Sequence, residues 1–358
     1  MVIAAFLLNT LLLLIALINF ALIRRPVTVA QADSDIAILL PVRNEVKNID
    51  RLLHELIAQQ HLANLRIVVI NDNSEDGTAA LARTFTSSLI TVLDAPAPQP
   101  GWIGKVSALD FGLQHLKQDL PEYIISIDAD VSFAPDAISR AVATARKLDL
   151  DFLSPYPRQI AITWAERLIQ PLLQWSWMST VILRGAEKIP MKSTVICNGQ
   201  FLVMKTQSLL ASGGFASVSH QVLDDIELGR SFVSSGFRGA VIDGSVLSAT
   251  RMYSSMAEIK AGYGKSLHRA FGGIGGAIAA TLFMIFSGIL PLLYSLTGNF
   301  LAIAALIAII ATRVLSAIAS SSRIRDAFLH PVSVFLFLYL LYYSWSHRSQ
   351  VQWKGRTV

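Results

Sequence analysis

Long apolar segments occupy both ends of the chain, and a mixed, periodic middle separates them. Residues 2–23 carry no charged side chain, and a helix of that length can cross a bilayer. Apolar sequence dominates again from 272 to 343. The pattern predicts membrane spans over 3–23, 273–295, 300–320 and 328–346. Arg313 falls inside the third span, where a long basic side chain near one end can snorkel to the interface.

The middle of the chain alternates short β-branched runs with helical apolar spacing. The runs predict strands at 36–40, 66–70, 89–93 and 123–127. The helical spacing between them predicts helices over 46–60, 79–87 and 105–117. Strands alternating with helices of this size indicate an α/β fold with a mostly parallel sheet and right-handed crossovers.

Residues 158–192 differ from this pattern because tryptophans are interspersed with arginine, glutamate and long aliphatic residues. Two interpretations stay open: a core helix of the globular domain, or a helix at the membrane surface, where indole rings accumulate. The predicted organisation is therefore an anchor over 1–25, an α/β domain over 33–250, an amphipathic interfacial segment over 251–271, about three spans over 272–346, and a basic tail over 347–358.

The basic residues next to the spans predict the orientation. Arg24 and Arg25 follow the first span, and nothing basic precedes it. The positive-inside rule then places the middle domain in the cytosol of a multi-pass cell-membrane protein. Basic residues at 260–269 agree with this orientation, whereas the basic tail disagrees if the last segment crosses the membrane.

Composition narrows the class of protein. The chain has 53% hydrophobic and 15% charged residues with a mean hydropathy of +0.50, which is too apolar for an ordinary soluble domain. Its one cysteine, Cys197, excludes an intramolecular disulfide. The net charge of +5 is modest and no basic run is interleaved with aromatics, so nucleic acid is not an expected partner. Membrane lipids are expected partners, because basic residues near the spans can contact anionic headgroups.

Polar segments follow three of the predicted strands, at 41–45, 71–78 and 128–130. Parallel sheets bind ligands beyond the carboxyl ends of their strands. The carboxylates of Asp128 and Asp130 can hold a hard divalent cation, and such a cation can hold a diphosphate. A second acidic pair about a hundred residues later, Asp224 and Asp225, could supply a base.

These segments together resemble family 2 of the glycosyltransferases, the membrane-anchored members with a GT-A fold. The matching segments are 41–45 (Pro-Val-Arg-Asn-Glu), 69–78, 101–105 (Gly-Trp-Ile-Gly-Lys), 128–130, 198–204, 213–215 and 223–229. Within the family the chain looks most like transferases that glycosylate lipids such as carotenoids, hopanoids or ceramide. The segments at 101–105 and 251–253 suggest the carotenoid- and hopanoid-associated branch.

The resemblance implies a metal and diphosphate site. Asp130 would ligate Mn²⁺ or Mg²⁺ directly, with Asp128 directed towards the nucleotide ribose or a metal-bound water. The metal would neutralise the departing nucleoside diphosphate. Lys105 would add a point charge on the diphosphate; its alternative interpretation is a solvated lysine.

The resemblance also implies a base-recognition side and a catalytic residue. Pro41, Glu45 and Asp72 would line the donor nucleotide, with Asp72 accepting the N–H of uracil. As alternatives, Glu45 and Asp72 are helix-terminal carboxylates. Asp225 would take the proton of the acceptor, and Asp224 is the better candidate for helix capping.

The resemblance thus predicts a membrane-bound, inverting transfer from a UDP-hexose to a lipid acceptor of carotenoid, hopanoid or ceramide type. Many membrane members carry a Gln-x-x-Arg-Trp motif before the C-terminal spans, but residues 265–271 read Lys-Ser-Leu-His-Arg-Ala-Phe. This departure argues against the first alternative, a processive polysaccharide synthase. A catalytically silent membrane scaffold of the same fold is the second alternative.

Overall fold

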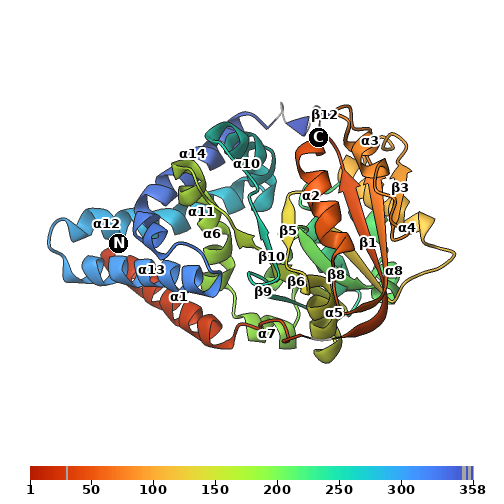
Figure 1. Cartoon of the computed structure of the whole chain (residues 1–358). Helices are drawn as coiled ribbons and strands as arrows, with labels where there is room; N and C mark the ends of the chain where they lie inside the picture. Colours follow the sequence, from red (N-terminus) through yellow and green to blue (C-terminus); the bar gives the residue numbers. More distant parts are fainter. Residues whose placement is uncertain (30, 349–351, 354–355, 358) are drawn as a thin grey trace. The chain divides into compact units, whose positions relative to one another are not determined.

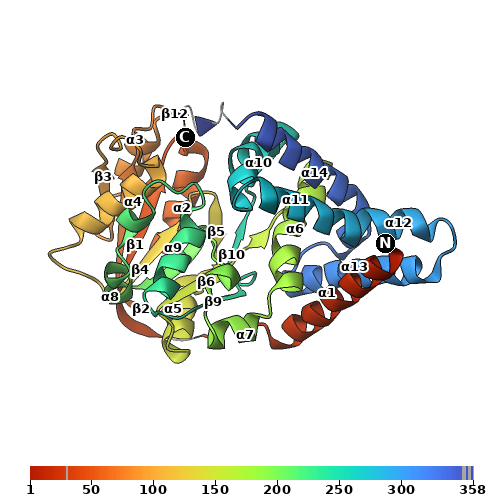
Figure 2. The same cartoon turned by 180° about the vertical axis from the view of Figure 1, so that it is seen from behind.

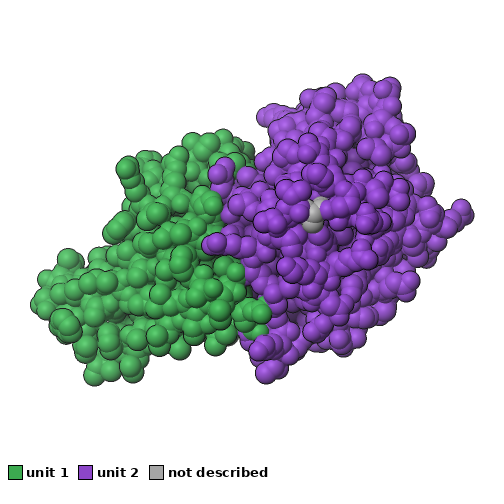
Figure 3. Space-filling model, turned by 60° about the horizontal axis from the view of Figure 1, so that its bottom comes forward, with its two compact units in different colours: residues 1–23, 159–184, 251–358 green, residues 24–158, 185–250 purple. Residues whose placement is uncertain are grey.

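The computed structural model describes residues 1–29, 31–348, 352–353 and 356–357. It divides into two compact units, drawn in green and purple in Figure 3. The sheet unit (purple) comprises Arg24–Arg158 and Gly185–Thr250. The helical unit (green) comprises Met1–Ile23, Gln159–Arg184 and Arg251–Val358.

The sheet unit is built on a seven-stranded sheet in the order β3-β2-β1-β4-β8-β6-β9. Its strands are β1 (Ala32–Val42), β2 (Leu62–Asn71), β3 (Ile90–Asp94), β4 (Tyr123–Ile127), β6 (Phe152–Tyr156), β8 (Phe201–Lys205) and β9 (Gly239–Asp243). The four strands from β3 to β4 are parallel, and only β8 runs antiparallel to its neighbours β4 and β6. The predicted α/β fold with a mostly parallel sheet is therefore confirmed.

Helices cover both faces of this sheet (Figures 1 and 2). Alternate residues of β1 point to opposite sides, so Ile36, Ile38 and Leu40 enter one core and Ala37 and Leu39 the other. The first core contains the apolar faces of α2 (Val46–Ile57) and α5 (Ala137–Lys147), and the second those of α4 (Gly104–His115) and α9 (Asp224–Ser234). The remaining helical turns of the unit are α3 (Thr78–Arg83), η1 (Lys192–Thr194), α8 (Thr206–Ala211) and η2 (Phe215–Val218), together with α7 (Leu183–Lys188) from Gly185 onwards.

The strand β1 continues past Pro41, where the sequence had predicted its end. Beyond Leu39, which pairs with Ser126 of β4, β1 keeps only β2 as a partner. A proline lacks the N–H that a second neighbour would need, so Pro41 is tolerated where one side of the strand is free of pairing. A small second sheet has the order β5-β10-β7, with β5 (Val131–Phe133), β7 (Arg158–Gln159) and β10 (Ser248–Thr250).

The helical unit contains four helices long and apolar enough to cross a membrane: Val2–Leu22, Ile274–Ser295, Phe300–Ala319 and Ile324–Ser346. They lie close to the four predicted spans and are compatible with membrane association. By element they are α1 (Val2–Leu22), α11 (Ile274–Met284), a π-helical turn η3 (Ile285–Ile289), α12 (Leu290–Ser295), α13 (Phe300–Ala319), η4 (Ile324–Leu329) and α14 (His330–Ser346). Two short strands, β11 (Gln352–Trp353) and β12 (Arg356–Thr357), pair near the C-terminus, and Lys354 of the predicted tail lies outside the described residues.

The helix α6 (Trp164–Thr180) belongs to the helical unit and is not a core helix of the sheet unit. Its buried Trp175 donates a hydrogen bond from Nε1 to Thr312 Oγ1 of α13 at 2.8 Å, whereas Trp164 is 64% exposed. The contiguous 33–250 domain is thus interrupted, because the apolar face of α6 packs on the candidate spans. The predicted amphipathic segment 251–271 forms α10 (Met256–Ala270), which packs on α14.

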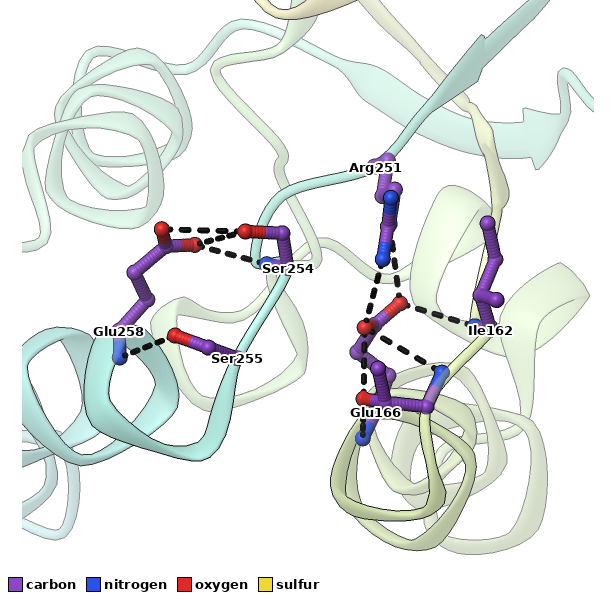
Figure 4. A network of polar contacts seen from close by, with 7 residues as sticks. Ile162, Glu166, Arg251, Ser254, Ser255 and Glu258 are labelled. Carbon is purple, nitrogen blue, oxygen red and sulfur yellow. Dashed lines mark hydrogen bonds and ion pairs between the residues drawn. The ribbon is translucent and has the colours of Figure 1, made fainter.

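A polar network lies at the start of α6 (Figure 4). Thr163 and Glu166 form a capping box, and Arg251 donates two further hydrogen bonds to the Glu166 carboxylate, at 3.0 and 3.1 Å. Figure 4 shows a second group nearby, in which Ser254 and Ser255 bond Glu258 at the start of α10. Burial alone would raise the pKa of Glu166. The hydrogen bonds that Glu166 accepts from Arg251, Thr163 and Ile162 outweigh burial and lower the pKa to about 2.

Candidate active site

The three polar segments predicted to form a site follow strands that are neighbours in the sheet. Val42 at the end of β1 pairs with Asn71 at the end of β2, and β1 also pairs with β4, which precedes Asp128. The Asp72 N–H donates to the Val42 carbonyl at 2.8 Å, and Arg43 Nη1 donates to the Asp72 carbonyl at 2.9 Å. The carboxyl ends of these parallel strands therefore bring the segments to one edge.

The turn between β2 and α3 is tied to the start of α2. Asp76 accepts hydrogen bonds from the N–H groups of Thr78 and Val46, at 3.0 and 3.1 Å, and the Thr78 hydroxyl accepts from the Glu45 N–H at 2.8 Å. Asp76 and Thr78 are thus turn and cap residues. Asp72 is buried but does not cap α3, whose N-cap is Gly77, so its helix-cap alternative does not hold.

The two acidic clusters that are far apart in the sequence meet at Lys105, in the first turn of α4. Its Nζ lies 2.6 Å from Asp128 Oδ1 and 4.0 Å from Asp224 Oδ2. The Lys105 side chain is 18% exposed, which does not fit a solvated lysine. Burial would lower the pKa of Lys105, but Asp128 and Asp224 raise it well above its usual value, so the group stays cationic.

Asp225 is held by backbone donors. Its Oδ2 accepts from the Gly199 N–H and its Oδ1 from the Ile226 N–H, both at 2.8 Å. A side chain at Gly199 would be crowded: its Cβ would lie 3.2 Å from Lys105 Nζ and 3.3 Å from Asp225 Cβ, so these neighbours would have to shift by a few tenths of an ångström.

The loop that carries Gly199 contributes contacts that the sequence did not assign. Asn198 Oδ1 accepts from the Gln200 N–H at 2.9 Å, and the Gln200 carbonyl accepts from the Asp128 N–H at 3.4 Å. The motif at 198–204 was the only signal available, and it gave no individual roles. The loop joins the backbone of the first acidic cluster to the carboxylate of the second.

The carboxyl groups of Asp224 and Asp225, near Lys105, both have raised pKa values. Burial raises the pKa of Asp224 to about 6; Lys105 lowers it, and Asp225 and Asp128 raise it further. Burial also raises the pKa of Asp225, against the lowering effect of Lys105 and of its backbone donors. A carboxyl whose pKa is raised towards neutrality can exchange a proton more readily near neutral pH.

Asp130 is half-buried beside the same cluster, with its Oδ1 atom buried. Its Oδ1 has no hydrogen-bond partner among the described residues. Burial, followed by the charges of Asp128 and Glu45, raises its pKa to about 7. A buried carboxylate oxygen without a partner calls for a bound group, and two carboxylates at a strand end suit a divalent cation with oxygen ligands. No group of three or more His, Cys, Asp or Glu side chains capable of holding a metal occurs within the described part of the chain.

The segment 265–271, which stands where many family members carry Gln-x-x-Arg-Trp, forms the end of α10. The His268 N–H donates to Ser344 Oγ of α14 at 2.9 Å, and its Nδ1 lies 3.2 Å from the same oxygen. His268 thus contacts α14 within the helical unit. Cys197 is a buried member of the second core of the sheet unit.

Comparisons with known proteins agree with this description. The model of the Glycosyl transferase family 2 matches residues 37–213. The chain is 26% identical over 337 residues to the 4,4'-diaponeurosporenoate glycosyltransferase of Staphylococcus aureus (strain MRSA252), covering 90% of this chain and 87% of that protein. The enzyme of strain USA300 gives the same identity and coverage.

A solved structure shares the fold. The mannosyltransferase PcManGT from Pyrobaculum calidifontis, in complex with GDP-Man and Mn²⁺, aligns with a TM-score of 0.55 at 17% identity, covering 96% of this chain and 95% of that one. The family match over residues 37–213 and the relatives support a family 2 glycosyltransferase that resembles carotenoid-associated enzymes, and the solved structure shows the shared GT-A fold.

Proposed function

We propose that the protein transfers a hexose from a UDP-sugar to a lipid acceptor, with inversion at the anomeric carbon. One observation supports this most strongly: Lys105 brings Asp128 of the first acidic cluster within 2.6 Å and Asp224 of the second within 4.0 Å of one ammonium group. A donor-binding pair next to an acid–base pair is what a direct displacement at a sugar carbon requires.

The donor side would be formed by residues at the strand ends. Asp72, with Pro41 and Glu45 beside it, would receive the uracil base, since a carboxylate suits an N–H donor. Asp130 and Asp128 would hold Mn²⁺ or Mg²⁺. When bound, the cation supplies charge neutralisation to the leaving diphosphate. PcManGT was solved with Mn²⁺, which motivates the test of that ion.

Lys105 would exchange one partner for another when the donor binds. Asp128 and Asp224 now compete for its charge, and a diphosphate oxygen could replace a carboxylate as its partner. That exchange would also remove a neutralising charge from Asp224. Lys105 therefore links occupancy of the donor site to the protonation of the acidic pair.

Asp225 would act on the acceptor. Its carboxylate is fixed by the N–H groups of Gly199 and Ile226, which positions a base without a metal. A lipid hydroxyl must lose its proton as the bond forms. A lipid carboxylate is already ionised at neutral pH, so it would need Asp225 much less.

The acceptor class rests on the relatives. The name of the Staphylococcus aureus enzyme describes an acceptor that is a carotenoid acid. We propose a carotenoid-type lipid here, with hopanoid and ceramide-like lipids as further candidates. A lipid acceptor also accords with the four helices long enough to cross a membrane.

Membrane insertion completes the proposal. The four helices would span the cell membrane with the sheet unit in the cytosol, because Arg24 and Arg25 follow the first of them. In this arrangement 1–25 is the anchor, 251–271 the interfacial segment, 272–346 the remaining spans and 347–358 the tail. An impermeant thiol reagent should then fail to label cysteines placed near 75 and 150 in intact cells; labelling there would reverse the orientation.

Product analysis distinguishes this proposal from its alternatives. Purified protein in lipid nanodiscs is given a UDP-hexose, Mn²⁺ and a carotenoid acid or alcohol, and the lipid extract is examined by mass spectrometry. A product carrying one hexose supports the proposal. A ladder of many hexoses would indicate a processive synthase, and neither transfer nor donor hydrolysis above background would indicate a silent scaffold.

A further inference from the structure

A pocket inside the helical unit is distinct from the candidate active site, all of whose residues belong to the sheet unit. It lies among α6, α13 and η4, and all three elements contribute residues to its lining. Its lining is unusually polar for a membrane segment: Gln159, Gln170, Pro171, Gln174, Arg313, Ser316, Ala317, Ser320, Ser322, Arg323, Asp326 and Ala327.

Arg313 is the central feature of this pocket. The residue is 2% exposed although it lies within a helix long enough to cross a membrane. Among the described residues its one hydrogen-bond contact is from Nη1 to His330 Nδ1 at 3.4 Å, and its buried Nη2 has no partner. A buried guanidinium without an anion is costly, and a basic residue at membrane depth marks a functional site by default.

The nearby acid does not satisfy Arg313. Asp326, which also lines the pocket, accepts two hydrogen bonds at its Oδ1 from Arg167, at 2.9 and 2.6 Å. Asp326 therefore already neutralises one arginine. With Arg313, Arg167 and Arg323 set against one carboxylate, the surroundings of the pocket carry an excess of positive charge.

A second donor also lacks an acceptor. Gln170 is 1% exposed, and its Oε1 accepts from the Tyr263 hydroxyl at 3.2 Å. This bond leaves the Gln170 Nε2 as the free end of the amide, and it is buried without a partner among the described residues. Two buried donors, one of them charged, thus line a pocket in which they find no acceptor.

We propose that this pocket binds the phosphate of an anionic phospholipid headgroup, with Arg313 Nη2 and Gln170 Nε2 as its donors. Basic pockets between membrane helices take such headgroups. Apolar side chains near the pocket, Ile318, Ile324 and Phe328, are exposed and would contact acyl chains. The site is separate from sugar transfer, and its test needs no activity.

The experiment uses the full chain in nanodiscs of phosphatidylcholine, with or without phosphatidylglycerol. Two quantities are measured: the apparent melting temperature, and the affinity for phosphatidylglycerol by native mass spectrometry. Phosphatidylglycerol should raise the melting temperature of the parent protein. Arg313→Gln should weaken its binding roughly tenfold or more, the effect of losing one hydrogen bond to a charged group, and remove most of the melting shift.

Two further variants keep the result interpretable. Arg325→Gln removes a charge from exposed η4 outside the pocket and should leave binding unchanged. Gln170→Glu places a carboxylate in the pocket that Arg313 also lines; it should raise the melting temperature in phosphatidylcholine and abolish the response to phosphatidylglycerol, and it tests the site even where Arg313→Gln does not fold.

Three outcomes would overturn the proposal. Equal losses in Arg313→Gln and Arg325→Gln would indicate general surface electrostatics. A response to phosphatidylglycerol that survives Gln170→Glu would place the lipid elsewhere. An equal shift produced by inorganic phosphate in phosphatidylcholine discs would indicate a soluble oxyanion instead of a lipid.

Discussion

The Nζ atom of Lys105 lies 2.6 Å from Asp128 Oδ1, so a residue from the start of α4 neutralises the first carboxylate after β4. Replacement by an uncharged side chain of similar length, Lys105→Met, should leave this carboxylate and the donor diphosphate without that charge. We expect kcat/KM for the sugar donor to fall roughly a hundredfold, the effect of removing one preorganised electrostatic group.

Lys117→Met is the matched control for this change, because Lys117 follows the same helix and is exposed. Initial rates at varied donor concentration measure both variants. Parental kinetics in Lys105→Met would mean that the ammonium group acts only within the protein and not on the donor.

The acidic pair gives a second prediction. Asp225→Asn keeps the size of the side chain and removes its basicity, so transfer to a lipid alcohol should fall roughly a hundredfold or more. Donor affinity should change little. Asp224→Asn should be milder, and transfer to a carotenoid acid should be less affected by either change, because a carboxylate brings no proton.

The measurement is the initial rate with both acceptor types, together with donor binding. An inactive Asp224→Asn beside an active Asp225→Asn would reverse the two roles. Full activity in both variants would remove the pair from the catalytic centre.

A pH dependence follows from the same pair. A base must be deprotonated, and the pKa of Asp224 is about 6 with that of Asp225 also raised. With a lipid alcohol as acceptor, the value of kcat/KM should therefore fall as the pH drops from neutral into the acidic range, because the raised pKa of Asp225 brings its protonation closer to neutral pH. The pKa of Asp224 in the folded protein, about 6, exceeds its usual value of 3.8. Protonation of Asp224 therefore stabilises the fold at low pH, and this stabilisation is lost as the pH rises through about 6. A flat rate profile between pH 5 and 8 would contradict the assignment.

Glu166 gives a prediction on stability alone. Its carboxylate is fully buried, accepts a hydrogen bond from Arg251 and takes part in the capping box at the start of α6. Glu166→Gln weakens the contact with Arg251, whose side chain is 36% exposed and can be solvated, and should lower the free energy of unfolding by about 1 kcal/mol, the scale of one hydrogen bond. Since its folded pKa is depressed to about 2, the stabilisation is present above the usual value near 4.5 and lost as the pH falls towards 2.

Thermal unfolding in detergent tests this, with Glu258→Gln as the control, because Glu258 is exposed and its carboxylate accepts hydrogen bonds from the nearby Ser254. Equal melting temperatures for Glu166→Gln and the parent protein would show that the network adds nothing.

The sequence predicted the parallel part of the sheet well because β1, β2 and β4 each contain a run of five buried residues, most of them aliphatic. Periodicity could not predict that β8 enters the sheet antiparallel between β4 and β6, since a strand direction is set by tertiary pairing. The assignment of α6 to the helical unit was equally beyond local pattern, because its amphipathic face fits a protein core or a membrane helix.

For the site, the order of motifs indicated the strand ends, but not the contacts between them. Nothing in local sequence predicts that Lys105 bridges Asp128 and Asp224, or that Gly199 donates its N–H to Asp225. These contacts depend on how α4, α9 and the loop before β8 pack on one face of the sheet, which is a property of the whole fold.

The most direct test of the central claim combines metal removal with a change at Asp130. Transfer by the parent protein is measured with the UDP-sugar and lipid acceptor after EDTA treatment, and again after Mn²⁺ is added back. We predict loss of transfer with EDTA, recovery with Mn²⁺, and no recovery in Asp130→Ala, although that variant should insert and melt like the parent. Near-parental turnover of Asp130→Ala with EDTA present would contradict the account.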